Sequence, residues 1–158
     1  MTEVATATTP EDEAKTAALA QYELIVGQRS EYGWEPALVD ADDYLVVFVR
    51  IVKPGGRTFV LRLRCDDYPE VAPELRFVDP STFDNPSEDI EPAAEFYPKG
   101  DSIAEAGQRG PLPVLCIKGH RDYYAGNWHS GWSNPPAHDH SPYQLVMNVR
   151  NAILDRWS

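Results

Sequence analysis

The chain has 158 residues, a length that suits one domain with its own hydrophobic core. Its formal net charge of −11 at pH 7 would repel a phosphate backbone, so we expect neither nucleic acid nor an anionic membrane as a partner. The apolar content of 42% and the charged content of 25% are ordinary for a globular protein, and no apolar run reaches the roughly 20 residues that span a bilayer.

The N-terminal stretch, MTEVATATTPEDEAK, has neither the basic nor the apolar region of a secretory signal. Without such a signal, the two cysteines, Cys65 and Cys116, are expected to be free thiols in a reducing cytoplasm. Residues 1–8 are small and polar, which predicts a disordered tail. We expect residues 9–158 to form a single domain.

A first helix is predicted from Pro10 onward. Thr9 can cap it, Pro10 suits the first helical position, and the acids that follow favour the positive end of the helix dipole. Gly27 is the expected stop. The predicted apolar face consists of Ala14, Ala17, Ala18, Tyr22 and Ile25.

Four strands are predicted next, at residues 34–39, 44–52, 58–65 and 74–78. A Lys-Pro-Gly-Gly turn at residues 53–56 separates the second strand from the third, and the short connections favour an antiparallel meander. The third strand alternates, which places the apolar side chains of Phe59, Leu61, Leu63 and Cys65 opposite Arg62 and Arg64. We therefore expect this strand to be half buried, with Cys65 in the core.

Residues 80–113 lack a strong period, and we expect a long loop with one helical turn near residues 102–106. Residues 79–106 hold eight acids against a single base, Lys99, which indicates either a solvated acidic loop or a docking surface for a basic partner. After a further irregular stretch at 118–140, Ser141 and Pro142 predict the start of a last helix. Its expected buried stripe is Val146, Val149, Ile153 and Trp157.

The segment FVLRLRCDDYPEVAPELRF, residues 59–77, resembles the ubiquitin-conjugating (UBC) family. Members of that family run from the third strand through a Tyr-Pro pair and a later proline into the fourth strand. Pro69 and Pro73 would hold such a connection extended. The resemblance implies an α+β, UBC-like fold: an N-terminal helix, a four-strand antiparallel meander, a long irregular active-site region and a C-terminal helix.

Val114-Leu115-Cys116-Ile117 resembles the segment that holds the family's active cysteine, and Trp128 or Trp132 matches the tryptophan that often follows it. The resemblance implies that Cys116 accepts a ubiquitin-like modifier from an activating enzyme as a thioester. It further implies that the modifier then passes to an amine of a protein substrate.

Three features depart from the family pattern. The usual His-Pro-Asn before the cysteine is missing, the first helix is acidic where relatives often show a basic face, and all four histidines follow Cys116. Similar departures occur among bacterial relatives, so the resemblance points to a divergent, bacterial member.

Thioester transfer requires a thiolate, a donor to the oxyanion and a group that helps to remove the proton of the amine. The predicted catalytic set is Cys116, His120, Asp122 and Asn127. A cationic His120 or Lys118 would favour the thiolate. The missing asparagine would be replaced by Asn127, Asn134 or His120, and Asp122 or Asp139 would orient a histidine or accept from the amine. Alternatively, Cys116 is a buried structural thiol.

Two other functions stay open. One is a catalytically inactive UBC-fold module that binds a ubiquitin-like protein. The other is a zinc-binding variant of the fold: no cofactor is expected, but Cys116 with His120 and later histidines could make a tetrahedral zinc site. A zinc ion on Cys116 would occupy the thiolate and exclude transfer, whereas a site made only of His129, His138 and His140 would brace the loop beside it.

Overall fold

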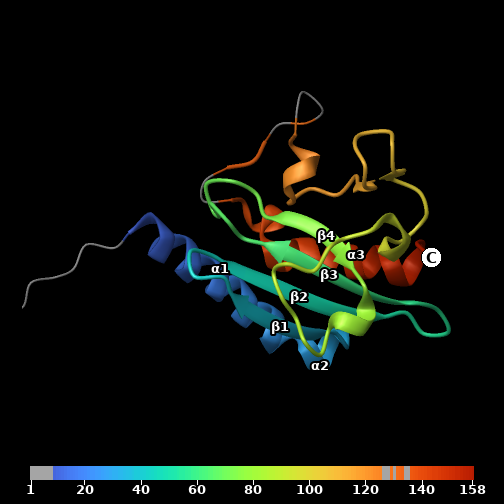
Figure 1. The fold of residues 1–158 in the computed structure, drawn as a ribbon, viewed down its shortest axis with the longest axis horizontal. Coiled ribbons are helices and arrows are strands. Elements are labelled where there is room, and N and C mark those ends of the chain that lie inside the picture. Colours follow the sequence, from blue (N-terminus) through green and yellow to red (C-terminus); the bar gives the residue numbers. More distant parts are fainter. Residues whose placement is uncertain (1–8, 126–128, 130, 134–135) are drawn as a thin grey trace, which may run out of the picture.

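The computed structural model describes residues 9–125, 129, 131–133 and 136–158. It is an α+β protein with an N-terminal helix, a four-stranded antiparallel sheet and a C-terminal helix (Figure 1). The helices are α1 (Pro10–Gly27), α2 (Arg29–Tyr32) and α3 (Pro142–Asp155). The strands are β1 (Glu35–Asp40), β2 (Leu45–Val52), β3 (Thr58–Arg64), β4 (Glu74–Val78), β5 (Ile103–Ala104) and β6 (Val114–Leu115). None of the described helices is long and apolar enough to cross a lipid bilayer.

Helix α1 starts and ends where the sequence predicts. The side chain of Thr9 accepts a hydrogen bond from the Asp12 amide at 3.1 Å, and the Asp12 carboxylate accepts one from the Thr9 amide at 3.4 Å. This reciprocal pair is a capping box, and it satisfies two donors that the first turn would otherwise leave free. Ala14, Ala18 and Ile25 are buried, which confirms the predicted apolar face.

The main sheet has the strand order β1-β2-β3-β4 with every neighbour antiparallel, as the meander prediction requires. Val49 of β2 pairs with Leu61 of β3, and Leu61 pairs with Phe77 of β4. One face of this sheet shares a core with the buried stripes of α1 and α3. The two helices therefore anchor the chain's ends on the same face of the sheet (Figure 1).

The prediction of a half-buried third strand is wrong. The second face of the sheet carries its own apolar cluster, in which Val60 is buried and Phe83 and Ile90 pack from the following loop. Arg62 on this face is only 3% exposed, and its guanidinium donates to the carbonyl oxygen of Ile90 at 2.7 Å. The arginines indicated a solvent-facing surface, but a segment distant in the sequence covers it.

The predicted helical turn near residues 102–106 is also wrong. Ile103 and Ala104 form β5, whose register pairs Ile103 with Leu115 and Ala104 with Val114 of β6. These hydrogen bonds join residues about ten positions apart, so local propensity did not reveal them. Short 3₁₀ turns occur instead at η1 (Pro80–Thr82), η2 (Ala94–Phe96), η3 (Arg121–Tyr123) and η4 (His138–His140).

Helix α3 begins at the predicted cap, where the Ser141 hydroxyl accepts from the Gln144 amide at 3.2 Å. The predicted stripe of Val146, Val149, Ile153 and Trp157 is buried. Beyond the helix, the indole of Trp157 donates to the carbonyl of Asp101 at 2.7 Å, and Ser158 exchanges two backbone hydrogen bonds with Lys99. A Cβ on Gly100 would lie 2.6 Å from the Trp157 ring, so this approach requires glycine. The chain's end thereby fixes the segment that leads into β5.

Candidate functional site around Cys116

Cys116 follows directly on strand β6, and its thiol side chain is exposed. Its amide donates to the carbonyl oxygen of Ser102 at 2.7 Å, which continues the pairing of the β5–β6 hairpin by one residue. The alternative that Cys116 is a buried structural thiol is therefore wrong. Cys65, in contrast, is 1% exposed, and burial raises the pKa of its thiol to about 12, which confirms the core assignment.

The loop from Cys116 to His120 is held at several points. The ring Nε2 of His120 lies 2.7 Å from the carbonyl oxygen of Leu115 and closes the loop on itself. The amide of Gly119 donates to the hydroxyl of Tyr124 at 3.1 Å. Gly119 has a φ of +112°, and a Cβ there would lie 3.1 Å from the carbonyl oxygen of His140, so glycine suits this position. The loop thus presents Cys116 from a fixed backbone.

His120 does not take the cationic role expected beside the cysteine. Its side chain is buried, at 2% exposed, and burial lowers the pKa of the imidazole to about 4. The ring is therefore neutral at pH 7, and the bond to the Leu115 carbonyl requires that Nε2 carries the proton. The other nitrogen, Nδ1, is buried without a hydrogen-bond partner among the described residues. Lys118, the other expected cation, is exposed.

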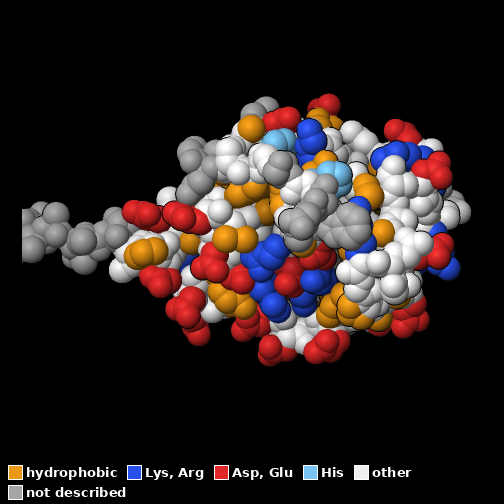
Figure 2. Space-filling model, turned by 90° about the horizontal axis from the view of Figure 1, so that it is seen from above, with side chains coloured by type: hydrophobic (Ala, Val, Ile, Leu, Met, Phe, Trp, Pro, Cys, Tyr) orange, Lys and Arg blue, Asp and Glu red, His pale blue; other side chains and the backbone are white. Residues whose placement is uncertain are grey.

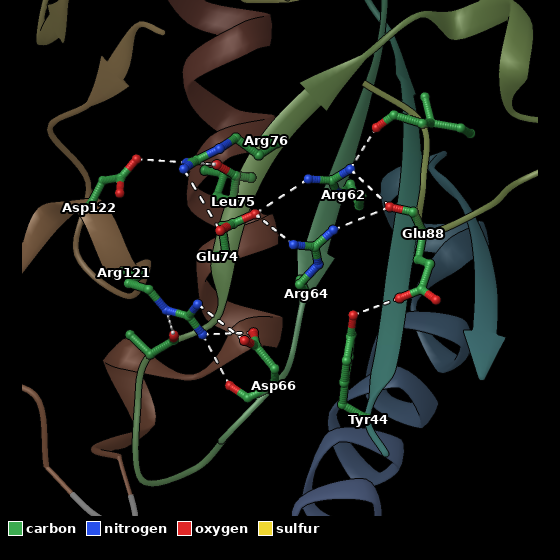
Figure 3. Close-up of polar contacts among 12 residues, drawn as sticks. Tyr44, Arg62, Arg64, Asp66, Glu74, Leu75, Arg76, Glu88, Arg121 and Asp122 are labelled. Atoms are coloured by element: carbon green, nitrogen blue, oxygen red, sulfur yellow. Dashed lines mark hydrogen bonds and ion pairs between the residues drawn. The ribbon is translucent and has the colours of Figure 1, made fainter. Parts of the chain in front are cut away.

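The predicted acids have other partners. A carboxylate oxygen of Asp122 accepts from the guanidinium of Arg76 at 2.7 Å, so Asp122 ties η3 to β4 rather than orienting a histidine (Figure 3). Asp139 lies 3.6 Å from the ring of His140, an ion pair only when that histidine is protonated. Asn127, Trp128 and Asn134, together with the side chain of His138, lie outside the described residues.

An arginine network surrounds Glu74 beside this site (Figure 3). The guanidinium groups of Arg62, Arg64 and Arg76 approach the Glu74 carboxylate to 3.3, 3.8 and 3.8 Å. Figure 2 shows a group of Lys and Arg side chains, with acidic side chains among them, near the middle of the face that it presents. In the sequence, the only sign of this arrangement is the spacing of the arginines in the third and fourth strands.

A hollow of about 350 Å³ is lined in part by Ile117, the residue that follows Cys116. The polar side chains in its wall belong to α3 and the turn after it: Asn148, Asn151, Asp155 and Arg156. The side-chain oxygen of Asn148 accepts from Gln144, and that of Asn151 accepts from Arg150. Among the described residues neither amide nitrogen has a partner, so both remain available as donors.

Sequence reasoning missed these asparagines, although a signal existed. Residues 148, 151, 152 and 155 recur at spacings of three and four, which places them along one side of the last helix, beside its buried stripe. A second hollow, of about 410 Å³, lies on the β5 side of the hairpin and includes Lys99, Ile103 and Pro113 in its wall.

Three of the described histidines, His120, His129 and His140, contact the neighbouring rings of Tyr123 and Tyr124. The ring of His129 stacks on Tyr123, with centroids 4.0 Å apart, while His120 is buried under the loop. Within residues 9–125, 129, 131–133 and 136–158, no group of three or more His, Cys, Asp or Glu side chains is placed to hold a metal ion. The indole of Trp132 lies against the Tyr68-Pro69 link and donates to the carbonyl of Pro69 at 3.0 Å.

The chain was also compared with known proteins. No family model, no curated protein and no solved structure matches it. The features that bear on its function are the exposed thiol of Cys116 and the polar groups that line a hollow with Ile117.

The first prediction concerns the two thiols. Ellman's reagent should titrate one thiol per folded chain and two after denaturation, because only Cys116 is exposed. The folded Cys116→Ser protein should titrate none, and folded Cys65→Ala should still titrate one. Rapid modification of Cys65 in the folded chain would contradict the structure.

The second prediction concerns His120. Its pKa is about 4 in the folded chain, against 6.5 for an ordinary histidine, so the unfolded chain binds more protons between these values. The contribution of His120 to the free energy of unfolding is fully present above about pH 6.5, and it falls by roughly 3 kcal/mol as the pH drops to 4. Denaturant unfolding at a series of pH values should show that the free energy of unfolding falls less steeply with falling pH in His120→Gln than in the wild type. His129→Gln, at an exposed position, should keep the wild-type slope, and equal slopes in all three proteins would refute the assignment.

Proposed function

We propose that this protein is a divergent ubiquitin-conjugating enzyme of the UBC fold, which carries a ubiquitin-like modifier on Cys116 and transfers it to an amine. The observation that carries the proposal is the exposed thiol of Cys116 at the end of β6. The next residue, Ile117, lines a hollow whose wall also contains Asn148 and Asn151. The other cysteine is buried and cannot compete for the modifier. The cytoplasm, where thiols stay reduced, is the compartment that suits this chemistry.

The order of elements supports the family assignment. An N-terminal helix, a four-strand antiparallel meander, an irregular region with the cysteine and a C-terminal helix agree with the order implied by the Tyr68-Pro69 resemblance. The indole of Trp132, one of the two tryptophans considered for the family position, hydrogen-bonds the carbonyl of Pro69. It also packs against the ring of Tyr68, with centroids 6.3 Å apart. The segment after the cysteine and the Tyr-Pro link therefore form one unit.

The proposed reaction has two transfers. In the first, the Cys116 thiolate attacks the modifier's C-terminal carbonyl carbon, which is bound as a thioester to the activating enzyme, and that enzyme's thiolate leaves. In the second, an amine of the substrate attacks the same carbon, loses a proton and displaces Cys116. Both steps place negative charge on the carbonyl oxygen, so amide donors beside the cysteine would stabilise the transition state.

Asn148 and Asn151 are our candidates for those donors. Their side-chain oxygens accept hydrogen bonds from Gln144 and Arg150, and both residues line the hollow together with Ile117. They would replace the asparagine that the family carries before the cysteine, a role that His120 cannot fill because its Nε2–H is committed to Leu115. The Asp155 carboxylate in the same hollow is an acceptor that suits an incoming amine.

The inactive binding module is the second candidate, and the absence of a His-Pro-Asn sequence favours it. It predicts noncovalent binding of a ubiquitin-like protein without any adduct. The zinc variant predicts stoichiometric metal in the purified protein, and metal-free active protein would exclude it.

The third prediction tests the adduct. Incubation with ubiquitin, its activating enzyme and ATP, or with a chemically prepared C-terminal thioester of ubiquitin, should give an adduct that thiol reductants remove. Cys116→Ser should abolish this reducible adduct, whereas Cys65→Ala should keep it. If neither the activating enzyme nor the chemical thioester gives an adduct, while ubiquitin still binds noncovalently, the protein is a binding module and not an enzyme.

The fourth prediction tests the donors. The rate constant for discharge of the preformed thioester to lysine should fall in Asn148→Ala and Asn151→Ala, and the double variant should lose roughly 10²–10³-fold. Gln144→Ala frees the Asn148 oxygen but keeps both amides, so it serves as the matched control. Unchanged discharge in the double variant would exclude the two asparagines as donors.

A further inference from the structure

We propose that Arg121 is a positioning residue for Cys116, one that locks the loop holding the thiol onto the Tyr68-Pro69 link; the catalytic meaning of this lock rests on the proposed function. Arg121 does not touch the reacting atoms. It acts through the backbone on which Cys116 is mounted.

The contacts of Arg121 span both ends of the link between β3 and β4 (Figure 3). At the near end, its guanidinium donates to the Asp66 carboxylate at 2.8 Å and to the Asp66 carbonyl at 3.0 Å. At the far end, its Nε donates to the carbonyl of Ala72 at 3.2 Å, and its own amide donates to the carbonyl of Pro73 at 2.8 Å. One residue after the cysteine loop thus satisfies acceptors from three residues of the link.

This geometry requires arginine. The guanidinium presents several N–H groups in a fixed planar fork, so it can meet the Asp66 carboxylate and two backbone carbonyls at the same time. A lysine carries the same charge at a single point and would not reproduce the set. The two side chains are about one-third exposed, so geometry rather than charge alone should decide the effect.

The lock reaches Cys116 because few residues separate the two. Cys116 is fixed at one side by Ser102, and His120 returns to Leu115 through its ring. Arg121 follows His120 directly, so it sets where the closed loop sits relative to the sheet. A second ion pair holds the same turn to the sheet: the carboxylate of Asp122, the next residue, binds the guanidinium of Arg76 in β4.

The test begins with a measurement that needs no modifier. Hydrogen exchange at the amides of residues 116–119 should be at least tenfold faster in Arg121→Lys, with a smaller increase in Asp66→Asn. Arg57→Gln is the matched control, because Arg57 also donates to loop carbonyls, those of Glu95 and Tyr97, on a different segment. Wild-type exchange in both Arg121→Lys and Asp66→Asn would overturn the inference.

The catalytic consequence is measured on the preformed thioester. In Arg121→Lys, kcat for discharge to lysine should fall about tenfold while the KM for lysine stays the same, because the thiol is misplaced and the amine site is intact. Arg57→Gln should retain the wild-type kcat. A wild-type kcat in Arg121→Lys would remove the positioning role even if the loop loosens. If the wild-type chain forms no thioester, the proposed function fails, and the exchange experiment still decides the lock.

Discussion

The buried guanidinium of Arg62 is the constraint on which the arrangement of the loops depends. It lies in the middle of the sheet's second face at 3% exposure, where an unpaired charge would be strongly unfavourable. Burial lowers its pKa, and the Glu74 carboxylate opposes this effect. The carbonyl of Ile90 supplies a hydrogen bond, so the loop after β4 must fold over the sheet to satisfy the charge. The long, proline-rich loop after β4, whose sequence has no periodicity, is thereby held in one conformation over the sheet.

That path determines where the candidate site lies. The loop leads to Lys99, whose backbone pairs with that of Ser158, after the end of α3. The Trp157 indole donates a hydrogen bond to the carbonyl of Asp101. Ser102 follows at once and receives the amide of Cys116. The thiol is therefore placed by the folding of the sheet's second face and by the chain's end, both distant from it in the sequence.

The chemistry proposed for Cys116 uses neutral groups more than charged ones. His120 is uncharged at pH 7 and serves the loop's structure, and Asp122 is paired with Arg76. The donors proposed to act on the thioester are the amides of Asn148 and Asn151, which line a hollow together with Ile117. Preorganised amide donors stabilise a developing oxyanion without reorganising at the moment of reaction. A zinc ion on Cys116 would end this reactivity, so metal content and transfer exclude one another at this cysteine.

The sequence by itself determined the elements whose signals are local: the capped starts of α1 and α3, the four strands with their turn, the buried stripe ending at Trp157, and Cys65 as a core thiol. Only the tertiary structure decided that Arg62 is buried, that β5 is a strand, that His120 is neutral and that Asn148 and Asn151 share a hollow with Ile117. The physical reason is that caps, turns and periodicity act within a few residues. Burial, pKa and the pairing of β5 with β6 depend on partners that the chain brings together only on folding.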